Sequence, residues 1–162
     1  MLAGLGYTVV ASTGKSAEAP YLKSIGASEI IGRDAIATGP KPLEDQRWAG
    51  AIDAVGGAPL DQILRTLKKN GVVCCFGNAA GETFTSSIYP FILRSVKLVG
   101  VNANHPVEKR RRAWSRMRRG GDLRPSNISR ICHRIAFVDL QKYCNEVVAG
   151  GIRGRAVVTM HV

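Results

Sequence analysis

The chain has 162 residues, of which 45% are hydrophobic and 22% charged, so a packed core is expected rather than a disordered chain. No apolar run approaches the roughly 20 residues that a membrane-spanning helix needs. Residues 1–5 carry no basic residue and are too few for a signal peptide, so we expect a cytoplasmic protein.

Apolar stretches and turn-forming residues alternate along the chain. The expected strands lie at residues 7–11, 29–31, 48–55, 72–76, 97–101 and 155–160. The expected helical segments lie at residues 1–5 (a last turn), 20–24, 60–69, 106–117 and 140–148, with Asn70-Gly71 closing the third and 35–47 as a loop. This order of elements predicts an α/β domain with a parallel sheet.

The cysteines and histidines do not form a metal-binding pattern. Cys74 and Cys75 are adjacent, whereas Cys132 and Cys144 are isolated, and there is no C-x-x-C pair. We expect reduced, structural thiols, with a reactive thiol as the minor alternative. A zinc site is not expected.

Three of the predicted strands end in small residues. These ends lie at residues 12–15, 55–57 and 77–79. Ligands of doubly wound sheets bind at the carboxyl ends of the strands, and small residues let a flat cofactor approach the backbone. The three ends together therefore indicate a cofactor site.

The first of these ends, Ser12-Thr13-Gly14-Lys15, contains no carboxylate. NAD-binding folds place an acidic residue here to hold the ribose 2′-hydroxyl. Two hydroxyls, a glycine and a lysine can instead bind a 2′-phosphate, which a carboxylate would repel. On chemistry alone, an ordinary surface turn with a solvated lysine explains the same residues equally well.

A resemblance to a known family is carried by the sequence runs at residues 9–15, 21–27, 48–56, 77–81, 90–96, 110–114 and 154–158. They resemble the medium-chain dehydrogenase/reductase superfamily, in the zinc-free quinone oxidoreductase-like branch that includes acrylyl-CoA reductase. The run at 90–96 is highly specific to that branch, and the resemblance covers essentially the whole chain.

The resemblance implies NADPH, no metal, and hydride delivery to an activated carbon–carbon double bond or a quinone-like acceptor. It implies an α/β fold, an incomplete Rossmann-like doubly wound parallel sheet lacking its first strand and glycine-rich loop. Residues 1–130 would form a partial NADP-binding domain, and residues 131–162 would return to a catalytic domain. A homodimer through the edge strand at 98–101 is also implied.

The resemblance also implies site residues, although no catalytic one. Ser12, Thr13, Gly14 and Lys15 would hold the 2′-phosphate of the adenosine, with Arg33 at the adenine end. The nicotinamide half would lie along Asn78 and Ile92, with Asn102 nearby. The alternatives are a plain surface arginine for Arg33 and core packing for Ile92.

Relatives begin with a catalytic domain, a strand and a glycine-rich turn, and nothing resembling them precedes Met1. We therefore expect an N-terminally truncated chain that is inactive alone, from either a degraded reading frame or a split gene. The strands at 7–11 and 49–54 would each lose a neighbour, and the strand at 155–160 would lack its partners.

The net charge of +11 is concentrated in one block. Residues 105–134 hold ten basic and two acidic residues (10 − 2 = +8), and the rest hold thirteen and ten (13 − 10 = +3). The predicted helix in this block also carries Trp114. Three explanations remain open: a solvated face, a site for an acidic ligand such as the phosphates of coenzyme A, or a nucleic-acid surface. A non-catalytic module binding nucleic acid or a full-length partner is the corresponding alternative function.

Overall fold

The structure is a computed structural model that describes residues 1–36, 39–102, 104–119 and 125–160. They form two compact units, which are described separately. The central unit comprises residues 11–17 and 30–107, and the terminal unit comprises 1–10, 18–29 and 108–162. Within the described residues, no helix combines the length and apolar character needed to span a membrane.

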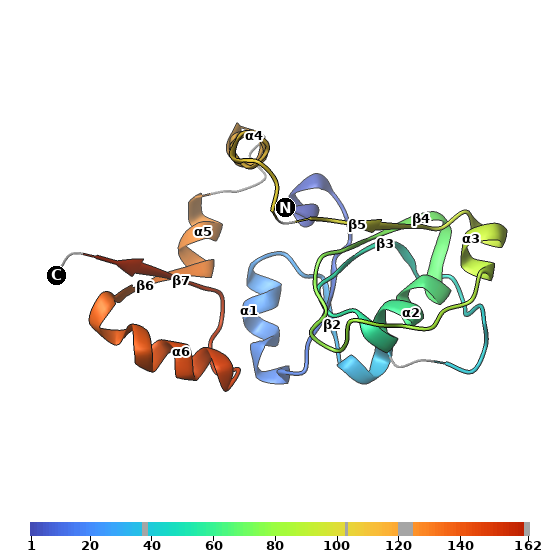
Figure 1. The fold of residues 1–162 in the computed structure, drawn as a ribbon, viewed down its shortest axis with the longest axis horizontal. Helices are drawn as coiled ribbons and strands as arrows, with labels where there is room; N and C mark the ends of the chain where they lie inside the picture. The colour runs from blue at the N-terminus through green and yellow to red at the C-terminus, as the bar shows by residue number, and fades with distance from the viewer. Residues whose placement is uncertain (37–38, 103, 120–124, 161–162) are drawn as a thin grey trace. The chain divides into compact units, whose positions relative to one another are not determined.

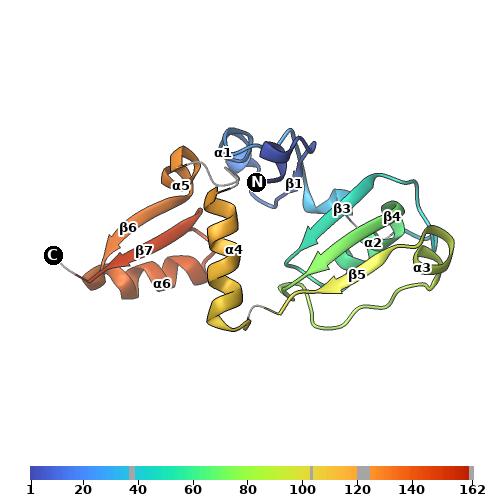
Figure 2. The same ribbon diagram turned by 90° about the horizontal axis from the view of Figure 1, so that it is seen from above.

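The central unit is built on a three-stranded parallel sheet of order β3-β4-β5 (Figure 2). The elements are η3 (Arg33–Ile36), β3 (Trp48–Asp53), α2 (Gly57–Thr66), β4 (Leu67–Cys75), α3 (Tyr89–Arg94) and β5 (Lys97–Gly100). The prediction of an α/β fold with a parallel sheet is confirmed. Helix α3 was not predicted.

Helix α2 covers one face of this sheet and supplies most of the core. Its apolar stripe buries Leu60, Ile63 and Leu64 in a core with Val73 of β4 and Val96, the residue before β5. Burying a leucine or valine side chain contributes roughly 1.5–3 kcal/mol. The predicted stripe is therefore the element that holds the central unit together.

The boundary between α2 and β4 differs from the prediction. The helix ends at Thr66, and Leu67, which is fully buried, begins the strand. Asn70, with a φ of 63°, lies inside β4 rather than at a helix end. Extra β4 residues bulge between the pairs Trp48↔Leu67 and Gly50↔Val72. Burial of Leu67 in the core thus outweighs the helical pattern.

The opposite face of the sheet carries an apolar row. Ala51, Val73 and Leu98 contact the core side, so alternation along each strand directs the next residues to the other face. Ile52 pairs with Cys74, which pairs with Val99. We call these three residues the open row, because Ile52 is 64% and Val99 43% exposed.

Strands β1 (Val10–Ser12) and β2 (Glu29–Ile31) form a separate two-stranded sheet. Between them in sequence lie a 3-10 turn (Ser16–Glu18) and helix α1 (Ala19–Ser24). Within the described strands, β1 pairs with β2 alone and β3 with β4 alone. Each sheet therefore has an unpaired edge, as expected for these two strands.

The terminal unit contains a second parallel pair, β6 and β7 (Figure 1). Besides a 3-10 helix at Leu2–Leu5, its elements are α4 (Val107–Arg119), α5 (Pro125–Ile131), β6 (Cys132–Ala136), η4 (Phe137–Asp139), α6 (Leu140–Val148) and β7 (Arg155–Thr159). The first residue of α4, Val107, is the last residue of the central unit. Helix α6 is the crossover that parallel strands require. The expectation that the last strand lacks partners is wrong, since β6 pairs with it along its whole length.

Replacing Leu64 by Ala should lower the free energy of unfolding by about 2–5 kcal/mol, because the side chain is fully buried and leaves a cavity. Urea denaturation measures the loss. The matched control is Leu93→Ala, whose side chain is 61% exposed and should change stability by less than about 0.5 kcal/mol. Equal losses in both variants would contradict the assignment of the core to α2.

Candidate functional site

The carboxyl end of β3 is held by a buried carboxylate. Asp53 is 2% exposed and ends the strand. Its Oδ1 accepts a hydrogen bond from the Val55 amide at 3.1 Å, and its Oδ2 accepts one from the Gly56 amide at 2.9 Å. A hydrogen bond to a charged group contributes about 1.5–3 kcal/mol, so this side chain fixes the turn that leads into α2.

The loops that follow β3 and β4 are in backbone contact. The Ala80 amide donates to the Val55 carbonyl at 2.8 Å, and Gly56 forms a parallel bridge with Gly81. A Cβ on Gly56, whose φ is 66°, would lie 2.7 Å from the Gly81 oxygen. A Cβ on Gly77 would overlap the Ala54 carbonyl. Glycine is therefore required at both positions. The two loops are in backbone contact with each other at the carboxyl ends of β3 and β4.

Asn78 and Asn102 both lie at this carboxyl edge. Asn78 follows β4, and its Cα would be 3.3 Å from a Cβ on Gly56. The Val101 amide donates to the Cys75 carbonyl at 2.8 Å, which keeps the residues after β5 beside the end of β4. Asn102 Oδ1 accepts from the Asn104 amide at 2.8 Å. The structure thus brings these two predicted site residues, both exposed, to neighbouring strand ends.

The turn after β1 brings together Gly14 and Arg33. The Thr13 amide donates to the Ile31 carbonyl at 3.0 Å, and Thr13 Oγ1 accepts from the Lys15 amide at 3.0 Å. A Cβ on Gly14 would lie 3.1 Å from Nε and 3.2 Å from Cζ of Arg33. The guanidinium therefore lies against the glycine backbone. The structure thus places Arg33 beside this turn.

Hydroxyls and cations dominate this turn. Ser12 and Lys15 are exposed beside it, and Asp34 folds its carboxylate against Gly32. A guanidinium and an ammonium beside hydroxyl groups suit a phosphate monoester, which accepts several charge-assisted hydrogen bonds. The chemistry of the residues present thus fits a phosphorylated ribose.

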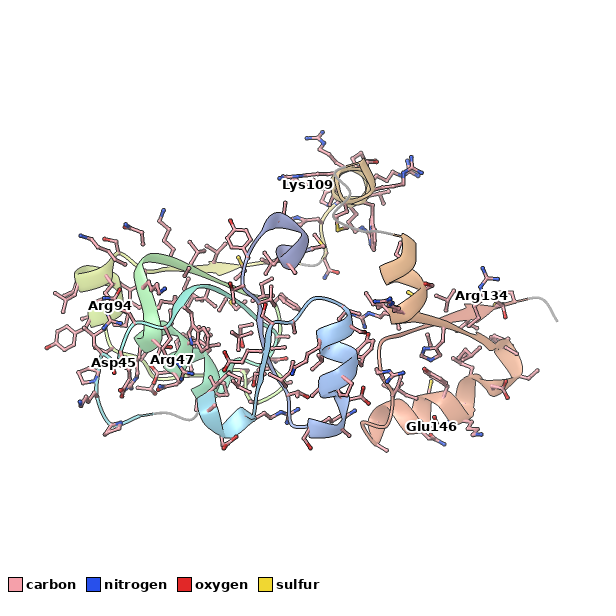
Figure 3. The ribbon with its side chains drawn as sticks, turned by 180° about the vertical axis from the view of Figure 1, so that it is seen from behind. Asp45, Arg47, Arg94, Lys109, Arg134 and Glu146 are labelled. Atoms are coloured by element: carbon pink, nitrogen blue, oxygen red, sulfur yellow. The ribbon has the colours of Figure 1, made fainter. Side chains whose placement is uncertain are left out.

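Ile92 lies away from Asn78 and Asn102. Arg94 of the same helix donates from Nη1 to the carbonyls of Arg65 at 2.8 Å and Leu67 at 3.2 Å, where β4 begins (Figure 3). Helix α3 is therefore at the amino edge of the sheet, opposite Asn78 and Asn102. Ile92 is also 63% exposed, so its side chain does not pack into the core.

Sequence reasoning missed the role of Asp53. The available signal was a carboxylate at the end of an apolar strand, two residues before Val55-Gly56-Gly57. A side-chain acceptor in that position commonly satisfies the amides of the following turn. In the part of the chain that the structure describes, no group of three or more His, Cys, Asp or Glu residues could hold a metal.

Comparison with known proteins gives a family match. The model of a family described as zinc-binding dehydrogenases matches residues 1–119. The acrylyl-CoA reductase AcuI of Ruegeria pomeroyi is 38% identical over 163 residues, which cover 99% of this chain and 49% of that relative. The chain thus spans about half the length of the curated relatives it matches.

Solved structures agree with this match. The YhdH oxidoreductase of Salmonella enterica, in complex with NADP, superposes with a TM-score of 0.92 at 37% identity, over 99% of this chain and 49% of that one. Bacillus subtilis YhfP, with NAD bound, superposes with a TM-score of 0.90 at 36% identity, over 98% of this chain and 49% of that one. Two similar structures thus contain different nicotinamide cofactors.

Replacing Asp53 by Ala should lower the free energy of unfolding by about 1–3 kcal/mol, because the Val55 and Gly56 amides lose their acceptor. Hydrogen exchange at these two amides should accelerate more than the global stability change requires. Asp45→Ala, which removes an exposed carboxylate, is the control. Unchanged protection of both amides would contradict the role given to Asp53.

Proposed function

Since the chain belongs to the zinc-binding dehydrogenase family, we propose that it is the NADP(H)-binding part of an NADPH-dependent oxidoreductase. The observation that carries the proposal is the Arg33 guanidinium against Gly14, in a turn without a carboxylate at residues 12–15. A 2′-phosphate finds positive charge and hydroxyls there, whereas NAD-binding folds offer an acid at this place.

Each residue of the candidate site has a proposed part in binding. Ser12, Thr13, Lys15 and Arg33 hold the 2′-phosphate of the adenosine, and Gly14 lets it approach the backbone. The nicotinamide half lies toward Asn78 and Asn102, on loops that Asp53 and the glycine contacts keep in place. Ile92, at the opposite edge, is left out of the site. When bound, NADPH supplies the hydride, and the protein residues bind and orient it.

We further propose that the reaction reduces an activated carbon–carbon double bond, as in an acrylyl thioester. The similarity to an acrylyl-CoA reductase supports this substrate, and a quinone-like acceptor is the second candidate. Strand β5 lies at the edge of its sheet, which supports a homodimer through residues 98–101. Unpaired strand edges readily pair with another chain.

NADPH should raise the thermal unfolding midpoint of the chain more than NADH at the same concentration. A ligand at one hundred times its Kd stabilises the state that it binds by about 2.7 kcal/mol. The Ser12–Lys15 turn can favour NADPH over NADH only if it contacts the 2′-phosphate. An equal rise with both cofactors would contradict that contact, and no rise with either would contradict cofactor binding by this chain.

Replacing Arg33 by Ala should weaken NADPH binding about 10-fold, equivalent to 1.4 kcal/mol, and leave NADH binding unchanged. Equilibrium titration followed by cofactor fluorescence measures both. Arg47→Ala is the matched control, because Arg47 is an exposed arginine of the central unit whose guanidinium stacks on Trp48 at 4.7 Å. Equal losses for NADPH and NADH would show that Arg33 does not read the phosphate.

The 162-residue polypeptide alone should not oxidise NADPH in the presence of acrylyl-CoA or a quinone. The groups at its carboxyl edge bind and orient a cofactor, whereas reduction also requires an acceptor held in reacting geometry. A steady-state assay at 340 nm (the wavelength at which reduced nicotinamide absorbs) measures the rate. A rate above that without protein would contradict this expectation.

A further inference from the structure

Helix α4 forms one wall of a surface groove in the terminal unit. The groove has a volume of about 460 Å³. Its lining consists of one face of α4 and one residue of α5: Arg111, Trp114, Ser115, Arg118 and Ile128. The four α4 residues follow the i, i+3, i+4, i+7 spacing that places side chains on one side of a helix. One face of α4 therefore supplies most of the residues that line the groove.

An aromatic surface is exposed in this groove. Trp114 is 64% exposed, and Ile128 is 44% exposed. In the described part of the chain, guanidinium groups stack on Trp48 and on Tyr21, but none stacks on Trp114. The indole face is thus available to a flat ring such as a nucleobase, which stacks favourably on aromatic side chains.

Two guanidinium groups flank this ring without a carboxylate partner. The ion pairs found among the described residues join Arg65 to Asp61 and Arg153 to Glu18, and none involves α4. Figure 3 shows nitrogen-tipped side chains, Lys109 among them, extending from α4. Arg111 and Arg118 therefore carry positive charge in the groove that no described acid neutralises.

We propose that this groove binds the adenine nucleotide end of a coenzyme A thioester. The adenine ring stacks on Trp114 beside Ile128, and Arg111 and Arg118 bind the phosphates. The inference rests on the proposed function, because it supplies a site for the acyl-CoA substrate. A planar guanidinium binds phosphate oxygens in pairs, and a cavity of this size falls in the range of small-ligand sites.

The volume favours a single nucleotide over a nucleic-acid strand. Strand-binding proteins use a groove that follows the backbone over several nucleotides, with successive aromatic residues. Among the described residues that line this groove there is one aromatic ring, and it lies between two arginines along α4. Its lining matches one base with the phosphates attached to its own ribose.

The test uses the full 162-residue chain and two probes, adenosine 3′,5′-bisphosphate and coenzyme A. The chain contains two tryptophans, so in a Trp48→Phe background the fluorescence reports on Trp114. Both probes should quench it saturably, and calorimetric titration of the unmodified chain should give the same Kd. The absence of binding by both methods would overturn the proposal.

Paired arginine variants separate the groove from general charge. Arg111→Ala with Arg118→Ala should weaken both probes by at least about 10-fold. Arg112→Ala with Arg116→Ala removes the same charge from α4 residues outside the groove and should change the Kd by less than about 3-fold. Equal losses in the two double variants would overturn the proposal, because net charge alone would then explain binding.

Two more measurements complete the design. A single-stranded oligonucleotide that binds more tightly than adenosine 3′,5′-bisphosphate, with steep salt dependence, would overturn the proposal in favour of a nucleic-acid surface. Arg33→Ala should leave the affinity for adenosine 3′,5′-bisphosphate unchanged. Failure of the groove is thereby distinguished from failure of the NADPH site, which the cofactor titrations test separately.

Discussion

The packing of α2 against its sheet is the interaction on which the candidate site depends. Leu60 and Leu64 of the helix pack with Leu67 and Val73 of β4 in one small apolar core. Because the helix is anchored there, the turn from β3 into α2 has a defined position. Asp53 then binds the amides of that turn, and Gly56 meets the loop after β4. Core packing is thus transmitted, through backbone contacts, to the edge where a cofactor would bind.

The residues of the candidate site use glycine in two ways. Gly56 and Gly77 are required because neighbouring carbonyls leave no room for a side chain. Gly14 instead leaves room for the Arg33 guanidinium, so its small size creates a charged surface rather than a contact between two backbone segments. The proposed binding of the cofactor and the stability of the loops therefore rest on different glycines, and changes at one group need not affect the other.

Sequence patterns predicted the elements whose signal was local. The strand at Glu29–Ile31 and the helix at Leu140–Val148 have the predicted bounds, and the parallel sheet is as expected. Strand β6 was missed because Cys132, His133 and Arg134 interrupt its apolar alternation, and its pairing with β7 compensates. Leu67 fitted the α2 stripe, but in the structure it is the first residue of β4, where its side chain is fully buried. The approach of Arg33 to Gly14 and the two bonds of Asp53 depend on tertiary placement, which local pattern does not encode.

The open row and the net charge act in opposite directions on the behaviour of the chain in solution. A net charge of +11 makes copies of the chain repel one another, whereas Ile52, Cys74 and Val99, beside the unpaired edge of β3, favour contact between sheets. Added salt screens the repulsion but leaves apolar attraction intact. Ionic strength therefore sets the balance between dispersed and associated chains, and the colloidal state of a sample depends on its buffer as much as on its concentration.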